Sequence, residues 1–412
     1  MVAEIVSIGT ELLMGQIANT DAQFISGRLP DIGIYVNYHT VVGDNRERII
    51  ECVQNALKRA DIVITTGGLG PTNDDITRET ISEIVGKPLV CDSQCILDIE
   101  AFFKSHNRVM TPNNKKQACF PEGSIIVRNA NGTAPGCIVE HENKTIIMLP
   151  GPPNELRPMF VDSIMPYLAQ KGGQKLKSVY LRIFGIGESA MEDCIEDLVV
   201  KQDNPTIAPY ASVGQVTLRI TARYSEEGEA ERLMQPVIDE IKKRLGDTIY
   251  STQNEELYQV VCDLLLKSNT TISLAESCTG GLISAALTDY PGISEVFKGG
   301  FNTYSNEMKM DILGVSKETL TRFGAVSEQC ALEMAKGALT KAKSDIALSV
   351  TGIAGPGGGS SEKPVGLVYI ALVTAHQSRV IKLNLWGERS RIRTNAVLHA
   401  LDMIRRYLSG LE

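Results

Sequence analysis

Short apolar runs alternate with amphipathic segments along roughly the first 168 residues. Continuous apolar runs, which are typical of buried strands, occupy residues 3–9, 60–68 and 144–151. Apolar residues at helical spacing, behind an acidic or asparagine start, predict helices over residues 21–29, 44–60 and 74–86. Strands that alternate with helices predict a parallel sheet covered on both faces, with its ligand crevice beyond the carboxyl ends of the strands.

The pattern changes twice further along the chain. The stretch "KGGQKLK" at 171–177 is typical of a linker, and a β-α-β-β-α order that ends near Ser251 predicts a small α+β module resembling a KH fold. From about residue 255 strands and helices alternate again. We therefore expect an α/β protein of three domains, which span residues 1–170, 171–252 and 253–412.

Composition narrows the class of protein. The 412 residues include 49 acidic and 41 basic side chains, and the net charge of −8 does not favour binding to nucleic acid or to anionic membranes. Over residues 174–250 acidic residues outnumber basic ones by 13 to 10, so the KH-like module lacks the basic surface of an RNA clamp. A structural spacer or a dimer arm is the better interpretation of this module.

Export and membrane signals are missing from the sequence. No apolar run approaches the ~20 residues that span a bilayer, and the first residues carry Glu4 and Glu11 without a basic n-region. The nine cysteines are odd in number and scattered, which predicts reduced thiols rather than a disulfide framework. We expect a cytoplasmic, multidomain enzyme of metabolism.

A glycine-rich turn, "TTGGLGPTNDD" at 65–75, follows a predicted buried strand and opens a helix. Glycines allow close backbone approach, and the N–H groups of a helix start suit a phosphate. Asp74 and Asp75 would repel that phosphate unless a divalent cation such as Mg²⁺ lies between them. The alternative interpretation is a glycine turn followed by a capping box of Thr72 and Asp75.

Further polar residues follow other predicted strands of the same sheet. Glu11, Asn19 and Asp21 come shortly after the first strand. "LPGPPNE" sets Gly151 and two prolines before Glu155 at another strand-to-helix corner, and "NANGTAPG" at 129–136 adds a polar loop. Because strand ends meet at one edge of such a sheet, this pattern favours a phosphate-binding crevice.

A second candidate site surrounds "AESCTGG", residues 275–281, between a predicted strand and a helix. Ser277 or Cys278 could act as a nucleophile there, yet none of the five histidines lies near them in sequence. A lysine that loses its proton is an alternative base, and "NTYSNEMK" offers Lys309 behind Tyr304. The competing interpretations are that Ser277 caps a helix, Cys278 is a core residue and Lys309 is solvated.

Two later stretches could bind an anion. "TGIAGPGGG" at 351–359 follows a buried strand, and its backbone N–H groups could hold a phosphate or an oxyanion. "GERSRIR" opens the last helix with Arg389, Arg391 and Arg393, where the helix dipole disfavours cations unless an anion binds. A flexible connection and a dimer contact are the respective alternatives.

The first domain resembles the molybdopterin-binding-like domain of the CinA family, on "TTGGLGPTNDD" and "LPGPPNE". In that family the domain is associated with metal-dependent hydrolysis of ADP-ribose to AMP and ribose 5-phosphate. The resemblance implies a divalent cation, Mg²⁺, Mn²⁺ or Co²⁺, held by Asp74 and Asp75, with Glu155 and Glu11 as further candidates for metal binding or water activation. The implied phosphate-binding residues are Thr66, Gly67, Gly68, Gly70, Asn19 and Gly151.

The last domain resembles the C-terminal domain of the same family, which comprises nicotinamide mononucleotide deamidases. The matching blocks include "AESCTGG", "GGFNTYSNEMKMDILGV", "SVTGIAGPGGG" and "GERSRIRTNAV". The resemblance implies that Ser277 attacks the carboxamide, that Lys309 acts as base and then acid, and that Tyr304 assists, without a cofactor. The implied substrate-binding residues are Thr279, Gly280, Gly281, Thr351, Gly352, Ala354, Gly355 and Arg391.

These features together predict a bifunctional hydrolase that recycles pyridine nucleotides, with nicotinamide mononucleotide and ADP-ribose as substrates. The resemblance also implies a homodimer. We expect no direct binding to nucleic acid or to a membrane. Two alternatives remain: the first domain binds molybdopterin, or the chain is a non-catalytic interaction protein in competence or DNA damage.

Overall fold

The computed structural model describes residues 1–171 and 175–411, so part of the predicted linker at 171–177 lies outside the described residues. The chain divides into two compact units. One comprises Met1–Lys177 with Arg223–Ala230, and the other comprises Ser178–Ala222 with Glu231–Glu412. No helix in the described part of the chain is both long and apolar enough to cross a membrane.

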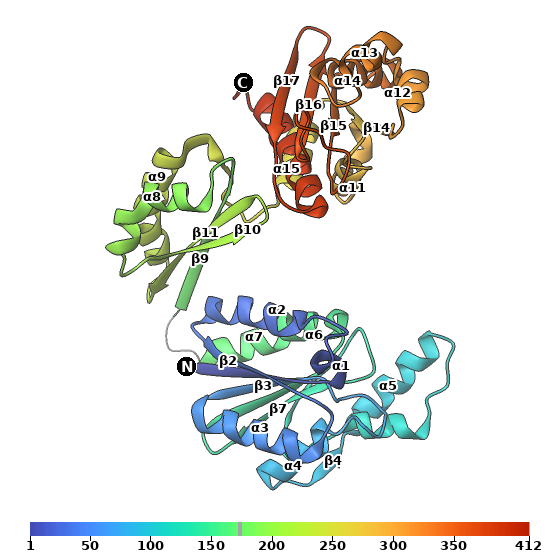
Figure 1. Cartoon of the computed structure of the whole chain (residues 1–412). Helices are drawn as coiled ribbons and strands as arrows, with labels where there is room; N and C mark the ends of the chain where they lie inside the picture. The colour runs from blue at the N-terminus through green and yellow to red at the C-terminus, as the bar shows by residue number, and fades with distance from the viewer. Residues whose placement is uncertain (172–174, 412) are drawn as a thin grey trace. The chain divides into compact units, whose positions relative to one another are not determined.

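A six-stranded sheet forms the centre of the N-terminal unit (Figure 1). Its strands, in spatial order, are β2 (Tyr35–Val42), β1 (Val2–Ile8), β3 (Ile62–Thr66), β8 (Lys144–Leu149), β7 (Gly136–His141) and β6 (Ile125–Val127). The first four run parallel, which confirms the predicted arrangement. β7 and β6 add an antiparallel edge, because a two-residue turn at Glu142 and Asn143 joins β7 to β8 as a hairpin.

Helices cover both faces of this sheet (Figure 1). One face carries α2 (Thr20–Arg28), α6 (Pro153–Met159), a π-helical turn (Phe160–Ile164) and α7 (Met165–Lys171), and the other carries α3 (Arg46–Arg59), α4 (Thr77–Val85) and α5 (Ser93–Ser105). The short helix α1 (Thr10–Leu13) and two 3₁₀ turns, Leu29–Ile32 and Pro112–Ala118, complete the unit. The two apolar faces of the sheet each bury a separate core cluster.

Two cysteines of this unit form a disulfide, which corrects the expectation that every thiol is reduced. β4 (Leu89–Cys91) and β5 (Cys119–Pro121) pair antiparallel in a small separate sheet, and this pairing sets Cys91 directly opposite Cys119. The two residues are 28 positions apart, so their contact follows from strand pairing and not from sequence spacing.

The middle segment contains the predicted β-α-β-β-α order, followed by one further strand. Its elements are β9 (Lys175–Phe184), α8 (Glu188–Val200), β10 (Thr206–Ser212), β11 (Gln215–Tyr224), α9 (Glu229–Leu245), a 3₁₀ turn (Gly246–Thr248) and β12 (Ile249–Ser251). The strands form a four-stranded sheet in the order β10-β11-β9-β12.

The C-terminal segment is built on a five-stranded sheet. In spatial order its strands are β14 (Phe297–Asn302), β13 (Ile272–Glu276), β15 (Ile346–Gly352), β16 (Leu367–Thr374) and β17 (Ser378–Asn384). β14, β13 and β15 are parallel, and β16 and β17 are antiparallel to their neighbours. The helices are α10 (Leu257–Ser268), α11 (Leu282–Thr288), α12 (Asn306–Leu313), α13 (Lys317–Phe323), α14 (Glu328–Ala342) and α15 (Arg389–Leu408), with a 3₁₀ turn at Ile293–Glu295.

Candidate active sites

The three parallel strands of the C-terminal sheet end at one edge, and the predicted catalytic residues lie there. Ser277 directly follows β13, and Thr303 and Tyr304 follow β14. The register places Glu276 opposite both Asn302 and Val350, so these strands end at the same level. The loop that follows β15 at Gly352 reaches the same edge. A parallel sheet therefore gathers residues that are far apart in sequence.

Lys309 is buried at this edge and contacts Ser277. It lies on α12, whose start is capped by Ser305 through acceptance of the Met308 N–H at 3.2 Å. Lys309 is only 1% exposed, so the interpretation as a solvated lysine is wrong. Its Nζ lies 3.0 Å from Ser277 Oγ, 2.7 Å from the Thr303 carbonyl oxygen and 3.1 Å from the Tyr304 carbonyl oxygen.

These contacts suit a neutral amine as well as an ammonium group. Burial lowers the pKa of Lys309, and the nearby thiols of Cys330 and Cys278 oppose this shift only in part. A neutral lysine has two N–H bonds and one lone pair. The two carbonyls can accept the two N–H bonds, which leaves the lone pair to accept the hydroxyl proton of Ser277. The structure thus brings together a hydroxyl and an amine that could act as nucleophile and base without a histidine.

Glu276 fixes the turn that carries Ser277, and the sequence analysis did not identify this role. Its buried carboxylate accepts the backbone N–H groups of Gly281 at 3.0 Å, Ile283 at 3.1 Å and Ser284 at 2.8 Å, as well as the Ser284 hydroxyl at 2.7 Å. Glu276 therefore satisfies the free N–H groups at the start of α11. Ser277 makes no capping bond there, so the interpretation of Ser277 as a helix cap is wrong.

Replacing Glu276 with glutamine is expected to destabilise this turn. The amide loses charge-assisted acceptance and turns its NH₂ group toward N–H donors, which costs about 2 to 4 kcal/mol. Differential scanning calorimetry should show the transition of the C-terminal segment lowered by about 5 °C or more. Glu295→Gln, an exposed substitution in the same segment, is the matched control. Equal melting temperatures for the two variants would refute the role assigned to Glu276.

A cleft of about 780 Å³ adjoins this turn and carries two arginines. It is lined by Ala354, Gly355, Pro356, Val365, Gly387, Glu388, Arg389, Ser390 and Arg393. Arg389 donates to the Gly355 carbonyl at 2.7 Å and to the Tyr304 hydroxyl at 3.3 Å. Arg393 donates to the carbonyls of Cys278 at 3.1 Å and Thr279 at 2.8 Å. Through these two side chains the start of α15 is bonded to the glycine loop, to Tyr304 and to the turn that carries Ser277.

The other predicted residues of this site differ in burial and in the partners of their side chains. Tyr304 is 65% exposed, and the contacts of its side chain lead to Arg389 and not to Ser277. Arg391 does not line the cleft. Its guanidinium lies instead over Trp386, 3.9 Å from the centre of the ring. Thr351 is buried and donates to the Ala325 carbonyl at 2.8 Å. Thr279 is also buried, and its hydroxyl has no partner among the described residues.

Cys278 is a core residue, as the alternative interpretation held. It is buried, and burial raises the pKa of its thiol to about 11. A thiol with such a pKa is protonated at neutral pH and is a poor nucleophile. Of the two adjacent candidates, Ser277 is therefore the better placed nucleophile.

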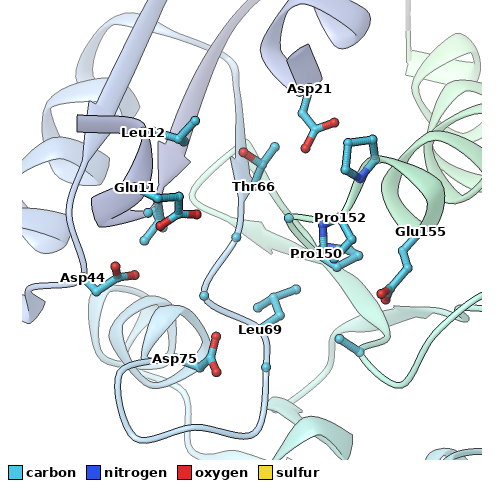
Figure 2. Close-up of a pocket in the computed structure, with 18 of the residues that line it drawn as sticks. Glu11, Leu12, Asp21, Asp44, Thr66, Leu69, Asp75, Pro150, Pro152 and Glu155 are labelled. Carbon is cyan, nitrogen blue, oxygen red and sulfur yellow. The ribbon is translucent and has the colours of Figure 1, made fainter. Parts of the chain in front are cut away.

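The N-terminal unit has a cleft of about 580 Å³ at the carboxyl ends of its parallel strands. It is lined by residues from every stretch singled out in the sequence: Glu11, Asn19 and Asp21 after β1, Thr66 to Gly70 after β3, Asp74 and Asp75 before α4, and Gly151 and Glu155 after β8. Figure 2 shows several of these side chains around the cleft. Asp44, which follows β2, lines it as well. Asp44 was not among the predicted residues, although "VVGDN" carries the same pattern of a strand followed by glycine and an acidic residue.

The charge of this cleft is strongly one-sided. Among the described residues, no lysine, arginine or histidine lines it. The six acidic residues that line it are Glu11, Asp21, Asp44, Asp74, Asp75 and Glu155. A phosphate would be repelled by such a wall unless a cation accompanied it. No group of three or more His, Cys, Asp or Glu side chains in the described ranges is spaced to hold a metal ion alone. The donors fit a hard cation that takes part of its coordination from a ligand phosphate and water.

The glycines after β3 let the backbone line the cleft closely. Gly67 has φ of +94°, and a Cβ there would lie 2.1 Å from the Ile8 carbonyl oxygen. A Cβ on Gly70 would lie 2.4 Å from Asp75 Oδ2. Any larger residue would therefore push β3 away from β1 or displace the Asp75 carboxylate.

Thr72 and Asp75 bond to one another but do not form a capping box. Asp75 accepts the Thr72 backbone N–H at 2.9 Å and also its hydroxyl, and that hydroxyl contacts Asp74. α4 begins only at Thr77, with no side-chain cap. The hydrogen bond from Thr72, together with Lys116, lowers the pKa of Asp74. Both carboxylates are thus held at the cleft in a turn that precedes the helix.

Asn19 and Glu155 have other partners inside the cleft wall. Asn19 caps α2 by accepting the Ala22 N–H at 3.1 Å and donates to Ser7 Oγ at 2.9 Å, so its side chain is already engaged. Glu155 accepts from Asn129 Nδ2 at 2.6 Å. Burial raises the pKa of Glu155, and this hydrogen bond opposes the shift in part. Glu155 is consequently a good candidate for proton transfer. Asn19 is a poor candidate for phosphate binding, because its side chain already has two partners.

Three family models match the chain, in the order of its segments. The model described as "Probable molybdopterin binding domain" matches residues 4–170. "Damage-inducible protein CinA KH domain" matches residues 178–251, and "CinA C-terminal domain" matches residues 254–408.

Relatives match over the full length. A "Putative competence-damage inducible protein" of Acetivibrio thermocellus is 56% identical over 412 residues, covering 100% of each chain. One of Clostridium perfringens is 51% identical over 413 residues, again covering 100% of each. Among solved structures, competence/damage inducible protein CihA from Agrobacterium tumefaciens is 44% identical; the match covers 38% of this chain and 97% of that one, with a TM-score of 0.36.

Proposed function

This chain belongs to the CinA family, and on that premise we propose that it is a bifunctional pyridine-nucleotide hydrolase. The C-terminal segment would convert nicotinamide mononucleotide and water to nicotinic acid mononucleotide and ammonia. The N-terminal unit would split ADP-ribose into AMP and ribose 5-phosphate with a divalent cation. The observation that supports this proposal most strongly is the 3.0 Å contact between buried Lys309 and Ser277.

The proposed deamidation begins with attack of Ser277 Oγ on the carboxamide carbon. The hydroxyl proton passes to the neutral amine of Lys309 as the carbon–oxygen bond forms. The carbon–nitrogen bond then breaks, and Lys309 returns the proton to the departing ammonia. Water attacks the resulting serine ester, Lys309 takes one of its protons, and this proton restores the Ser277 hydroxyl as the acid leaves.

The neighbouring cleft supports a phosphorylated substrate. Arg389 and Arg393 line it beside the glycine loop, and a phosphomonoester would find two guanidinium groups there. Arg393 also holds the Cys278 and Thr279 carbonyls. Binding of the phosphate would thus be linked to the position of the serine turn.

Deamidation is expected to depend on pH through Lys309. The base must be neutral, so activity should be present above the pKa of Lys309 and lost as pH falls through it. Burial lowers that pKa, so the inflection in kcat/KM should lie below the ordinary lysine value of 10.5. Ammonia release measured from pH 5 to 10 tests this. A rate that falls with rising pH over that range would contradict the assignment of Lys309 as the base.

The N-terminal cleft supports the second activity through its charge. Asp74 and Asp75 would hold the cation, and the glycine loop would approach the diphosphate. A bound Mg²⁺, Mn²⁺ or Co²⁺ would offset the repulsion of the six carboxylates and polarise a phosphorus–oxygen bond. Glu155, whose pKa is raised by burial, is proposed to accept a proton from the attacking water.

A further inference from the structure

Asp21 is a buried ionisable side chain with an unsatisfied oxygen at the wall of the N-terminal cleft. It lies in the first turn of α2, is 8% exposed and lines the N-terminal cleft. Its Oδ1 is buried and has no hydrogen-bond partner among the described residues. Leaving a buried polar atom unsatisfied costs about 1 to 3 kcal/mol. Such an atom at the wall of a cleft is accounted for if a ligand group satisfies the carboxyl.

The surroundings of Asp21 leave it charged at neutral pH. The titratable groups on elements that pack against α2 or line the same cleft are Arg157, Glu155, Asp31, His39, Tyr35, Tyr38, Glu11, Asp44, Asp74 and Asp75. Burial raises the pKa of Asp21 to about 6, and Arg157 opposes this shift. Above that pH the carboxylate can only accept hydrogen bonds.

Asp21 lies apart from Asp75, one of the two proposed cation ligands (Figure 2). Figure 2 shows Asp21 and Asp75 at opposite ends of the cleft, with the carboxyl of Asp21 directed into it. A carboxylate repels a phosphate but accepts hydrogen bonds from sugar hydroxyls, and acidic residues bind ribose hydroxyls in other nucleotide sites. The part of the ligand that fits Asp21 is therefore a hydroxyl donor.

We propose that Asp21 binds a ribose hydroxyl of the nucleotide ligand and so makes the cleft select ribose over deoxyribose. The inference rests on the proposed function of the N-terminal unit, because ADP-ribose carries two ribose rings. A deoxy ligand would leave the Asp21 carboxylate unsatisfied. We expect it to bind about 10- to 100-fold more weakly.

The two reaction products test this proposal without turnover. Isothermal titration calorimetry on the full chain with Mg²⁺ compares AMP with 2′-deoxy-AMP and 3′-deoxy-AMP, and ribose 5-phosphate with 2-deoxyribose 5-phosphate. The expected result is that at least one product binds about 10-fold or more tightly than its deoxy counterpart at pH 7.5. This preference should disappear in Asp21→Asn and persist in Asp162→Asn, an exposed control in the same unit.

The preference also has a defined pH dependence. A protonated carboxyl is a weaker acceptor, so the preference should fall as pH drops through about 6 in the wild type and not in Asp21→Asn. A preference that instead grows as pH drops through about 6 would show that the protonated carboxyl recognises the sugar, which would overturn the proposal. Equal binding of ribose and deoxyribose ligands by the wild type would also overturn it.

A loss of the ribose preference in Asp21→Asn can be distinguished from a loss of folding and from a failure of the proposed hydrolysis. Because the folded state raises the pKa of Asp21, the contribution of this group to stability is lost as pH rises through about 6. Asp21→Asn should therefore melt no lower than the wild type at pH 7.5. If ADP-ribose is not hydrolysed but the ribose preference depends on Asp21, the proposed activity fails and the binding site stands. Hydrolysis by the wild type without any ribose preference would overturn the Asp21 proposal alone.

Discussion

Replacing Ser277 with alanine, or Lys309 with methionine, is expected to lower kcat/KM for nicotinamide mononucleotide by about 1000-fold or more. Ser277 supplies the only hydroxyl that Lys309 Nζ contacts at this strand edge, in the part of the chain that the structure describes. Without the hydroxyl no ester can form, and without the amine no group takes its proton. Because the two residues act as one unit, the double variant should be hardly worse than either single variant. Steady-state ammonia release measures all three variants.

Matched controls distinguish chemistry from folding in this prediction. Cys278→Ser removes the adjacent thiol and should retain activity, whereas loss of activity there together with retention in Ser277→Ala would assign the reaction to the thiol. Lys336→Met changes an exposed lysine of the same segment and should leave the rate unchanged. Lys309→Met also leaves the carbonyls of Thr303 and Tyr304 without their donor, so calorimetry must show that this variant still unfolds cooperatively.

Replacing Asp75 with asparagine is expected to lower metal-dependent ADP-ribose hydrolysis by about 100-fold. Asparagine can keep the bond from the Thr72 N–H but loses the charge that a divalent cation requires. Chelation with EDTA should abolish the same activity in the wild type, and Mg²⁺, Mn²⁺ or Co²⁺ should restore it. The measurement is the formation of AMP and ribose 5-phosphate in equal amounts.

The independence of the two sites provides the control for Asp75→Asn. The same preparation should deamidate nicotinamide mononucleotide at the wild-type rate, since Asp75 and Ser277 lie in different compact units. Asp162→Asn should change neither activity. Full ADP-ribose hydrolysis by Asp75→Asn in the presence of EDTA would show that the reaction needs no metal. Binding of molybdopterin without any hydrolysis would favour the alternative function of this unit.

Local patterns were sufficient to predict most elements that carry the sites. The apolar runs correspond to β1, β3 and β8, and the helices predicted over residues 21–29, 44–60 and 74–86 correspond to α2, α3 and α4. Parallel topology explains why polar residues that follow different strands meet, because all such ends lie at one edge. This rule predicts that Glu11, Asp75 and Glu155 lie around one cleft, and all three line it.

Contacts between distant side chains could not be obtained from those patterns. Ser277 and Lys309 are 32 positions apart, and only the pairing of β13 with β14 brings them together. The sequence also left open which arginine of "GERSRIR" reaches the cleft. Successive helical positions point in different directions, so Arg389 and Arg393 line it while Arg391 packs on Trp386. The role of Glu276 was not predicted because its bonds run to N–H groups that lie 5 to 8 positions further along the chain.

The decisive experiment is to quantify both products after incubation of the wild-type chain with nicotinamide mononucleotide. We expect equal amounts of ammonia and nicotinic acid mononucleotide, formed without added metal and unaffected by EDTA. If neither product forms under conditions in which the chain is folded, the contact between Ser277 and Lys309 does not support this reaction, and the deamidase assignment is wrong.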